Sequence, residues 1–312
     1  MRLLTTLEVE RLLTPALALR AVRRAFQAVA SKQWRPGEST ELNAERAPIR
    51  IAWSRDEESG LAADMAWDRA GSGRILFQEP PEYRALLKLE AIHRLRASAV
   101  SSLATESLAR ADASVLAVIG TGDQARLHIH AITRVRDIKR VLVVGRTAAK
   151  AQLFVAELLR ELGGGMRFEA TDAGRASSLA DVLCLCTDSA TPVLLGNEVG
   201  KGCHINAIGA TTFDAREVDT NTVLRSKVVI EDKEYGITSA GDLRIPVEEG
   251  RIDGAAFQTD LGDLVAGKRT ARACDDDITF FKSVGHPAVD FYLALAAYEA
   301  AVEERVGVEV EL

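Results

Sequence analysis

The stretch SVLAVIGTGDQA, residues 114–125, decides the fold of this chain. Residues 115–119 (VLAVI) form a short apolar run rich in small and β-branched side chains, which predicts a fully buried strand. The run ends in the turn GTGDQA (120–125), of the form G-x-G-x-x-A, and an apolar pattern of helical spacing follows from Leu127 to Ile132. A glycine turn between a buried strand and a helix predicts a dinucleotide-binding βα unit.

The members of this turn have separate physical roles. Gly120 allows the tight turn, Gly122 lets the backbone approach a pyrophosphate, and Ala125 lets the helix pack closely on the strand. The N–H groups at the start of the helix face the phosphate charge, and Thr121 and Gln124 belong to the same predicted site. The alternative interpretation is an ordinary βα turn that binds no nucleotide.

A second βα step follows directly. Residues 140–145 (RVLVVG) predict a second buried strand, and residues 148–162 predict a second amphipathic helix. The two steps have the length of a βαβα unit, at roughly 30 residues per step. We therefore expect an α/β fold with a Rossmann-type doubly wound parallel sheet, whose later strands lie at 167–170, 182–186, 204–208 and 228–231.

The end of the second strand indicates which dinucleotide binds. An NAD site usually places Asp or Glu about 20 residues past the glycines, where it binds the ribose 2′-hydroxyl. This chain has Gly145-Arg146-Thr147 there, and its next carboxylate is Glu157. Arg146 can pair with a 2′-phosphate and stack on adenine, and the Thr147 hydroxyl can donate to the same phosphate. The sequence favours NADPH over NAD; the alternative is a solvated Arg146 beside a helix N-cap at Thr147.

Composition restricts the class of protein. The chain has 312 residues, enough for two domains, and its net charge of −6 indicates solubility. It has no basic patch with interleaved aromatics and no apolar run near the roughly 18 residues of a membrane span, which argues against nucleic-acid and membrane partners. Charges interrupt the apolar residues of the segment MRLLTTLEVERLL, so we expect no signal peptide and a cytoplasmic protein.

The cysteines and histidines predict no metal site. Cys184, Cys186 and Cys203 lie on predicted strands and have the character of small core residues. The five histidines show no ligand spacing, and His128 and His130 lie two apart on a predicted helix, so they do not share a face.

The chain divides into two expected domains, 1–112 and 113–287, and the C-terminal helix 288–312 is expected to return to the first. Thr14-Pro15 is a helix restart, because Thr suits the N-cap and Pro the first helical position. The elements expected outside the nucleotide domain are helices within 6–30, over 92–110 and over 287–306, and strands at 49–53 and 74–77.

Ligands of an open α/β sheet bind at the carboxyl ends of its strands. Cys186-Thr187 ends one expected strand, and Ile208-Gly209 ends another, two residues before Thr211. Val284-Gly285 precedes the last helix. We expect these three segments to line the cofactor and substrate sites.

Two arginines of the first domain are candidate partners for a carboxylate. Arg96 lies on the long expected helix and Arg50 on an expected strand. Guanidinium groups suit bidentate binding of a carboxylate, although the plainer interpretation of both residues is a surface arginine.

Several segments, taken in order, resemble the ornithine cyclodeaminase/mu-crystallin family. The resemblance covers most of the chain from about residue 73 onward, and its specificity comes from several motifs in the right order. The segments are ALLKLEAIHRLRASAVSSLATESLAR (85–110), VIGTGDQARLHIHAI (118–132), INAIGATTFDAREVD (205–219), DLGDLVAGKRTAR (260–272) and ITFFKSVGHPAVDFYLALAAYE (278–299).

The resemblance implies a Rossmann domain joined to an N-terminal α+β domain for substrate binding and dimerisation, and hence a homodimer. It also implies chemistry at the bond between a nitrogen and an α-carbon that bears a carboxylate, with hydride moving between that carbon and the nicotinamide. By resemblance, Arg96 matches the arginine of the R-T-A-A motif that holds the substrate carboxylate. Val284 and Gly285 match the loop beside the nicotinamide.

The chain departs from the family pattern at three places. True cyclodeaminases carry Asp where this chain has Thr211, which is no general base near neutral pH; mu-crystallin-like reductases also lack this Asp and tend to show an Arg-Thr pair after the second strand. The family's substrate lysine has no counterpart between Met65 and Arg74. His93 stands where the family often has Thr, and is either a proton donor to an imine nitrogen or a plain helix residue.

These observations lead to one preferred hypothesis and two alternatives. The preferred one is NADPH-dependent reduction of a small ketimine or cyclic imino acid of the Δ1-pyrroline-2-carboxylate type, with Arg96 on the carboxylate and His93 or water as proton donor. The alternatives are an NAD-dependent ornithine cyclodeaminase and an NADPH-binding protein without turnover.

Overall fold

The computed structural model describes residues 1–42, 49–68, 72–79, 82–210 and 212–311. The chain forms two compact units, a first unit of Met1–Ala99 with His286–Leu312, and a second unit of Val100–Gly285. The boundaries therefore fall inside helix α3 (Glu90–Leu108) and directly before helix α11 (Pro287–Glu303). The sequence analysis placed them at residues 112 and 287.

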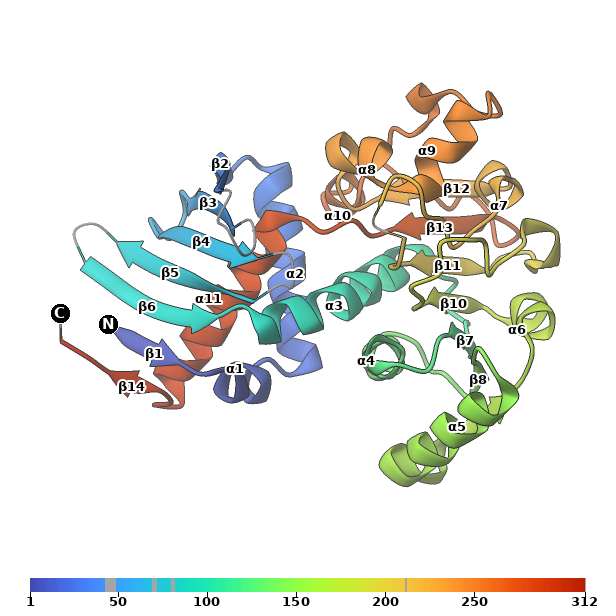
Figure 1. Cartoon of the computed structure of the whole chain (residues 1–312), viewed down its shortest axis with the longest axis horizontal. Helices are drawn as coiled ribbons and strands as arrows, with labels where there is room; N and C mark the ends of the chain where they lie inside the picture. The colour runs from blue at the N-terminus through green and yellow to red at the C-terminus, as the bar shows by residue number, and fades with distance from the viewer. Residues whose placement is uncertain (43–48, 69–71, 80–81, 211, 312) are drawn as a thin grey trace. The chain divides into compact units, whose positions relative to one another are not determined.

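The first unit is built on a seven-stranded sheet in the order β14-β1-β6-β5-β4-β3-β2 (Figure 1). β1 and β6 pair in parallel, and all other neighbours pair antiparallel. Besides α3 and α11, its elements are β1 (Arg2–Leu4), α1 (Thr6–Leu12), α2 (Pro15–Ala30), β2 (Trp34–Leu42), β3 (Ile49–Asp56), β4 (Ala62–Asp68), β5 (Gly73–Glu79), β6 (Glu82–Lys88) and β14 (Val308–Glu309).

The helices of this unit begin where the sequence places start signals. Thr14 caps α2 by accepting a hydrogen bond from Leu17 N at 3.3 Å, with Pro15 at the first helical position, so the predicted restart is confirmed. Strands β3 and β5 are confirmed, whereas β2, β4 and β6 were not predicted. Exposed charged residues interrupt the apolar pattern of β2 and β6, and two partly buried aspartates interrupt that of β4.

The two faces of this sheet differ. One face packs on α11, where the ring of Phe77 lies 5.2 Å from that of Phe291 and 6.4 Å from that of Tyr298. On β3 the burial pattern alternates, and Ile49, Ile51 and Trp53 are exposed. An exposed row of large apolar side chains is typical of a surface that another molecule covers.

The second unit is built on a seven-stranded parallel sheet in the order β12-β13-β11-β10-β7-β8-β9. The strand order reverses between β7 and β10, so the predicted doubly wound, Rossmann-type sheet is confirmed. Its strands are β7 (Val115–Ile119), β8 (Arg140–Val144), β9 (Arg167–Ala170), β10 (Val182–Leu185), β11 (His204–Ala207), β12 (Ser226–Ile230) and β13 (Ile278–Lys282).

Helices cover both faces of this parallel sheet (Figure 1). α4 (Asp123–Ile132) and α5 (Ala148–Leu162) bury Ile129 and Phe154 against one face, and α6 (Ala173–Leu179) buries Ala176 against the other. The remaining helices are α7 (Thr220–Leu224), α8 (Lys233–Ser239), α9 (Gly241–Glu248) and α10 (Leu261–Val265), with 3-10 turns at Gly163–Gly165, Gly196–Glu198 and Gly254–Ala256.

Strand β13 differs from expectation. The sequence analysis gave this segment no strand, yet β13 lies inside the sheet between β11 and β12 and all its residues are buried. Its run ITFFK has the β-branched and aromatic character of a strand, and the Lys282 at its end is wholly buried. The sheet therefore has one interior strand more than predicted.

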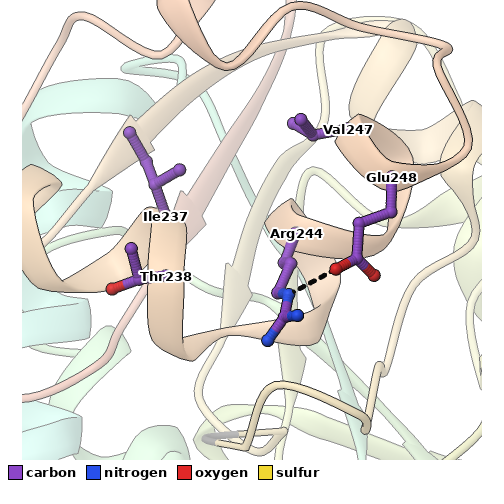
Figure 2. A pocket seen from close by; sticks show the side chains of 5 residues that line it. All are labelled: Ile237, Thr238, Arg244, Val247 and Glu248. Atoms are coloured by element: carbon purple, nitrogen blue, oxygen red, sulfur yellow. Dashed lines mark hydrogen bonds and ion pairs between the residues drawn. The ribbon is translucent and has the colours of Figure 1, made fainter.

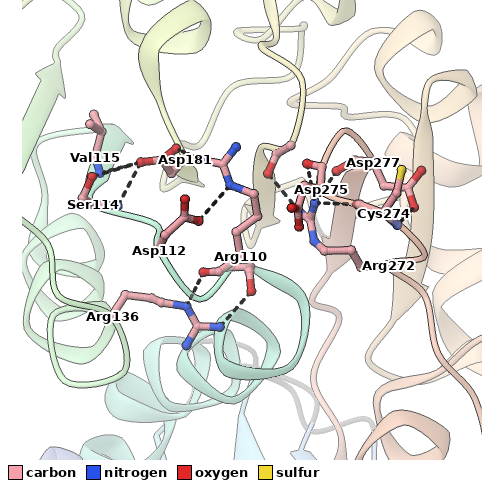
Figure 3. A network of polar contacts seen from close by, with 12 residues as sticks. Arg110, Asp112, Ser114, Val115, Arg136, Asp181, Arg272, Cys274, Asp275 and Asp277 are labelled. Carbon is pink, nitrogen blue, oxygen red and sulfur yellow. Dashed lines mark hydrogen bonds and ion pairs between the residues drawn. The ribbon is translucent and has the colours of Figure 1, made fainter.

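Arginines close the end of α3 (Figure 3). Arg136 donates to the carbonyl oxygens of Thr105, Ala109 and Arg110 at 3.0, 2.8 and 2.8 Å. Arg272 donates to Leu108 O at 2.7 Å. Carbonyls at and just after the end of a helix lack some of the donors found in its interior, and these guanidinium groups add donors there, even though Thr105 O also accepts from Ala109 N.

Candidate active site

Strand register brings most of the predicted cofactor residues to one edge of the parallel sheet. Leu185 pairs with Ile119 and with Ala207, and Ala207 pairs with Lys282. These four residues end β7, β10, β11 and β13. The residues that follow them, 120–122, 186–187, 208–209 and 283–285, therefore lie side by side at the carboxyl edge, where open α/β sheets bind ligands.

Gly120 is required by the turn after β7. Its φ is +130°, and a Cβ built on it would lie 2.3 Å from the carbonyl oxygen of Cys186. Its N–H donates to Val144 O at 2.9 Å. The turn thus passes between the ends of β8 and β10 with no room for a side chain, as predicted for the first glycine.

The start of α4 has the features of a phosphate site. Gly122 is the N-cap, no side chain caps the helix, and a Cβ built on Gly122 would meet nothing within 4 Å. Ala125 is fully buried against the sheet, while Thr121 and Gln124 are partly exposed beside the turn. Helix N–H groups next to open space on a glycine backbone fit a pyrophosphate.

The end of β8 carries the residues predicted to select the cofactor. The side chain of Arg146 is 78% exposed, and its Nη2 lies 3.2 Å from the carboxylate of Asp188 in the loop after β10. Thr147 caps α5 by accepting from Lys150 N at 3.3 Å. The Thr147 hydroxyl thus has the N-cap role of the alternative interpretation, while the Arg146 guanidinium lies exposed at the surface beside Asp188.

A buried carboxylate ties the ends of β10 and β11 together. Glu217 is fully buried; its Oε1 accepts from Thr187 N at 3.0 Å and Thr187 Oγ1 at 2.7 Å, and its Oε2 accepts from Gly209 N at 2.7 Å. Burial raises the pKa of Glu217 to about 7, although the nearby Lys282 ammonium opposes the rise. The two predicted cofactor segments at Thr187 and Gly209 are thereby held in one geometry.

A buried ion pair lies beside this carboxylate. Lys282 Nζ is 2.8 Å from Asp242 Oδ2 and donates to Gly209 O at 3.1 Å, and both side chains are fully buried. Asp242 Oδ1 accepts from Glu217 N at 2.7 Å and Val218 N at 3.1 Å. The pair connects β13, α9 and the segment at Glu217, so it fixes the strand ends rather than offering a free charge.

Another carboxylate shapes the loop after β13. Glu231 Oε2 accepts from Ser283 Oγ at 2.7 Å, Val284 N at 2.9 Å and Gly285 N at 2.8 Å. Gly285 has a φ of +85°, which favours glycine. The three donors of the predicted nicotinamide loop therefore all bind one carboxylate oxygen of Glu231.

The first unit gathers two of the predicted substrate residues. Arg96 Nη1 lies 2.9 Å from Asp290 Oδ2, and His93 Nε2 lies 3.7 Å from the same oxygen. The Arg96 side chain is 35% exposed. Arg50 instead pairs with Glu41 across β2 and β3 at 3.2 Å, and Thr211 lies outside the described residues.

The sequence analysis did not identify the acidic residues at the strand ends, Glu217 and Asp242, or Asp290, the acidic partner of Arg96. Glu217 and Asp242 are 25 residues apart and Arg96 and Asp290 are 194 apart, so no local spacing relates them. The one available signal was Lys282, a lysine at the end of an apolar run, because a buried lysine requires an acidic partner.

The predicted core cysteines differ in environment. Cys184 and Cys203 are buried, and burial raises the pKa of each thiol to about 12. Cys186 is partly exposed, with its backbone against Gly120. In the part of the chain that the structure describes, no three His, Cys, Asp or Glu side chains are grouped to hold a metal ion.

A hollow of about 340 Å³ lies between α8 and α9 (Figure 2). Its lining contains none of the predicted site residues, and its Arg244 pairs with Glu248 at 2.6 Å. It is therefore separate from the candidate active site.

Among the described residues, no helix combines the length and apolarity needed to cross a membrane.

Comparisons with known proteins give a family match and similar enzymes. A profile of the ornithine cyclodeaminase/mu-crystallin family matches residues 82–305. A Δ1-pyrroline-2-carboxylate reductase of Bacillus cereus is 38% identical over 228 residues, which cover 73% of this chain and 70% of that protein.

Two solved structures are similar over nearly the whole chain. The Δ1-pyrroline-2-carboxylate reductase of Thermococcus litoralis, in complex with NADH and L-proline, has a TM-score of 0.88 and 31% identity and covers 99% of this chain and 100% of that one. An archaeal alanine dehydrogenase dimer with bound NAD has a TM-score of 0.88 and 28% identity and covers 100% of this chain and 99% of that one.

Proposed function

This chain belongs to the ornithine cyclodeaminase/mu-crystallin family, and from that membership we propose that it is an NADPH-dependent reductase of a small cyclic imino acid of the Δ1-pyrroline-2-carboxylate type. The observation that carries the proposal is the similarity to a reductase structure that contains NADH and L-proline. L-proline is the product expected when the C=N bond of Δ1-pyrroline-2-carboxylate is reduced.

The choice of NADPH rests on the end of β8. The relatives with bound dinucleotide contain NADH or NAD. In this chain no carboxylate follows β8 directly, and the exposed guanidinium of Arg146 lies there instead. A guanidinium attracts a 2′-phosphate, whereas the usual Asp or Glu of an NAD site repels it.

The residues have separate roles in the proposed reaction. A dinucleotide bound at the glycine turn would supply the hydride for the carbon of the C=N bond. Arg96 binds the substrate carboxylate and thereby fixes the carbon that is reduced. We assign His93, which lies near Asp290, the role of proton donor to the imine nitrogen, with water as the alternative donor. The glycine turn and the start of α4 bind the pyrophosphate.

The proposal includes a homodimer. The similar archaeal alanine dehydrogenase is a dimer. In the first unit, Ile49, Ile51 and Trp53 are 38%, 40% and 49% exposed at alternate positions of β3. A second copy of this chain is the occupant that we propose for this face, because burial of such a row stabilises association.

The proposal is tested by titrating the purified protein with NADPH and NADH, followed by fluorescence, with and without Δ1-pyrroline-2-carboxylate. Tight NADPH binding and substrate-dependent loss of NADPH are expected. NADPH binding without consumption across a panel of imino acids would identify a non-catalytic binding protein. Binding of NADH alone, with ammonia release from ornithine, would return the cyclodeaminase alternative to first place.

A further inference from the structure

Asp290 lies in the first turn of α11, and two nitrogen-bearing side chains of α3 meet it. Arg96 Nη1 is 2.9 Å and His93 Nε2 is 3.7 Å from its Oδ2. Asp290 is only 8% exposed. His93 and Arg96 are three residues apart and so share one face of α3. A single carboxylate therefore contacts both residues assigned to the substrate.

The two oxygens of the Asp290 carboxylate differ in their partners. An acidic side chain in the first turn of a helix is favourable, and a structural carboxylate normally has donors on both oxygens. Asp181 is such a case: its Oδ1 accepts from Arg110 and its Oδ2 accepts from Ser114 N at 2.9 Å. Among the described residues, Asp290 Oδ1 is buried and has no hydrogen-bond partner.

We propose that Asp290 is a positioning residue of the substrate site, which fixes the Arg96 guanidinium and the His93 imidazole for a substrate whose nitrogen and carboxylate share one α-carbon. The inference rests on the proposed function. Nothing in it requires Asp290 to touch the substrate. It acts through Arg96 and His93, whose spacing on α3 sets the separation between the carboxylate-binding group and the proton donor.

The physical reason is the flexibility of arginine. A free arginine side chain samples many rotamers and loses this freedom when it binds a ligand. An arginine already held by a buried carboxylate has lost much of that freedom before the substrate arrives. Substrate binding is then tighter, provided that the carboxylate does not block the guanidinium edge that binds the ligand.

The test is a double-mutant cycle on ligand binding. The probe is pyrrole-2-carboxylate, a planar molecule with an N–H group beside a carboxylate, and its affinity is measured by calorimetry on the NADPH complex. Asp290→Asn is expected to weaken binding about tenfold, while NADPH affinity stays unchanged. In an Arg96→Ala background the same substitution is expected to have a smaller effect, because only the action of Asp290 through His93 remains.

A matched control is available on the same helix. Glu299 of α11 pairs with Arg24 of α2 at 3.2 Å, and its side chain is 54% exposed. Glu299→Gln removes a carboxylate that faces an arginine elsewhere and is expected to leave the affinity unchanged. Asp290→Glu retains the charge and is expected to recover part of the affinity; it also serves if the asparagine variant does not fold.

The outcomes separate the two proposals. Equal loss of affinity from Asp290→Asn with and without Arg96 would overturn the positioning role alone, as would an increase in affinity, which would mean that Asp290 competes with the ligand. If the wild-type protein neither binds pyrrole-2-carboxylate nor consumes NADPH with any imino acid, the proposed function itself fails.

Discussion

At the scale of single residues, substitution of Arg96 separates substrate binding from cofactor binding. Arg96→Ala removes the proposed charge-assisted contact to the substrate carboxylate, so kcat/KM for the imino acid is expected to fall roughly 10- to 100-fold. The Kd for NADPH is expected to stay the same. The control is Arg94→Ala on the same helix, whose arginine pairs with Glu10 at 2.9 Å. Steady-state kinetics of both variants give the comparison. Equal losses of kcat/KM in Arg96→Ala and Arg94→Ala would contradict the proposed role of Arg96 in substrate binding.

Arg146 and Asp188 form a second residue-scale prediction. Arg146→Ala is expected to weaken NADPH binding about tenfold and to leave NADH binding unchanged, because only NADPH carries the 2′-phosphate. Asp188 lies 3.2 Å from Arg146 and competes with that phosphate, so Asp188→Asn is expected to strengthen NADPH binding. Fluorescence titration with both cofactors measures the ratio. A parallel loss of both affinities would show that Arg146 does not select the cofactor.

At the scale of elements, the end of α3 depends on Arg136. Its guanidinium is half-buried and donates to Thr105 O, Glu106 O and Ala109 O between 2.8 and 3.0 Å. Arg136→Ala removes these donors, while Thr105 O still accepts from Ala109 N at 2.9 Å, and the free energy of unfolding is expected to fall by about 1–3 kcal/mol. Arg134→Ala, an exposed neighbour, is expected to change it by less than about 0.5 kcal/mol. Urea unfolding of the two variants gives the comparison.

The elements that could be predicted from the sequence are those whose burial shows as an apolar pattern over a few consecutive residues. β7, β8 and β10 lie within a residue of their expected bounds, because parallel strands buried on both faces read as continuous apolar runs. β2 escaped prediction, since its sequence WRPGESTEL contains Pro, Gly and several polar residues.

The residues of the candidate site likewise divide into those that could be predicted from the sequence and those that could not. The strand-end segments could be predicted, because parallel strands end at a common edge whatever their sequence separation. Glu217, Asp242 and Asp290 could not, because their partners lie on other elements and only the fold brings them together. The role of His93 was left open by the sequence, and its contact with Asp290 is the observation that now supports a functional role.

At the scale of the whole molecule, the exposed face of the first sheet predicts the oligomeric state. Trp53→Glu introduces a charge into the apolar row on β3, which opposes burial against a second copy. The wild-type protein is expected to be a dimer and the variant a monomer, as measured by light scattering after size exclusion. Leu7 is 77% exposed on α1, outside this row, and Leu7→Glu is the control. A monomeric wild-type protein would contradict the proposed dimer.

Acid stability is a second property of the whole fold. His128 and His204 are buried, and burial lowers the pKa of His128 to about 4 and that of His204 to about 3 from an ordinary 6.5. Below pH 6.5 the unfolded chain takes up protons that the folded chain does not, so stability falls as the pH falls from 6.5 toward 4, by about 1.4 kcal/mol per pH unit and histidine.

The contribution of His128 to this pH dependence can be tested by substitution. His128→Gln is expected to reduce the slope of unfolding free energy against pH by about one proton between pH 5 and 6, and urea unfolding at several pH values measures it. An unchanged slope would mean that His128 is protonated in the folded protein.

The path of the chain also sets an order of assembly during synthesis. The first sheet contains β1 to β6, but the helix that covers its inner face, α11, begins at Pro287, and its edge strand β14 pairs with β1 only at residues 308–309. On the ribosome, this sheet emerges early and lacks α11 and β14 while all of the second unit is synthesised. Within the second unit, β12 must likewise wait for β13, its neighbour in the sheet. The first unit, whose strands β1 to β6 are translated first, can therefore be completed only after α11 and β14 have been synthesised.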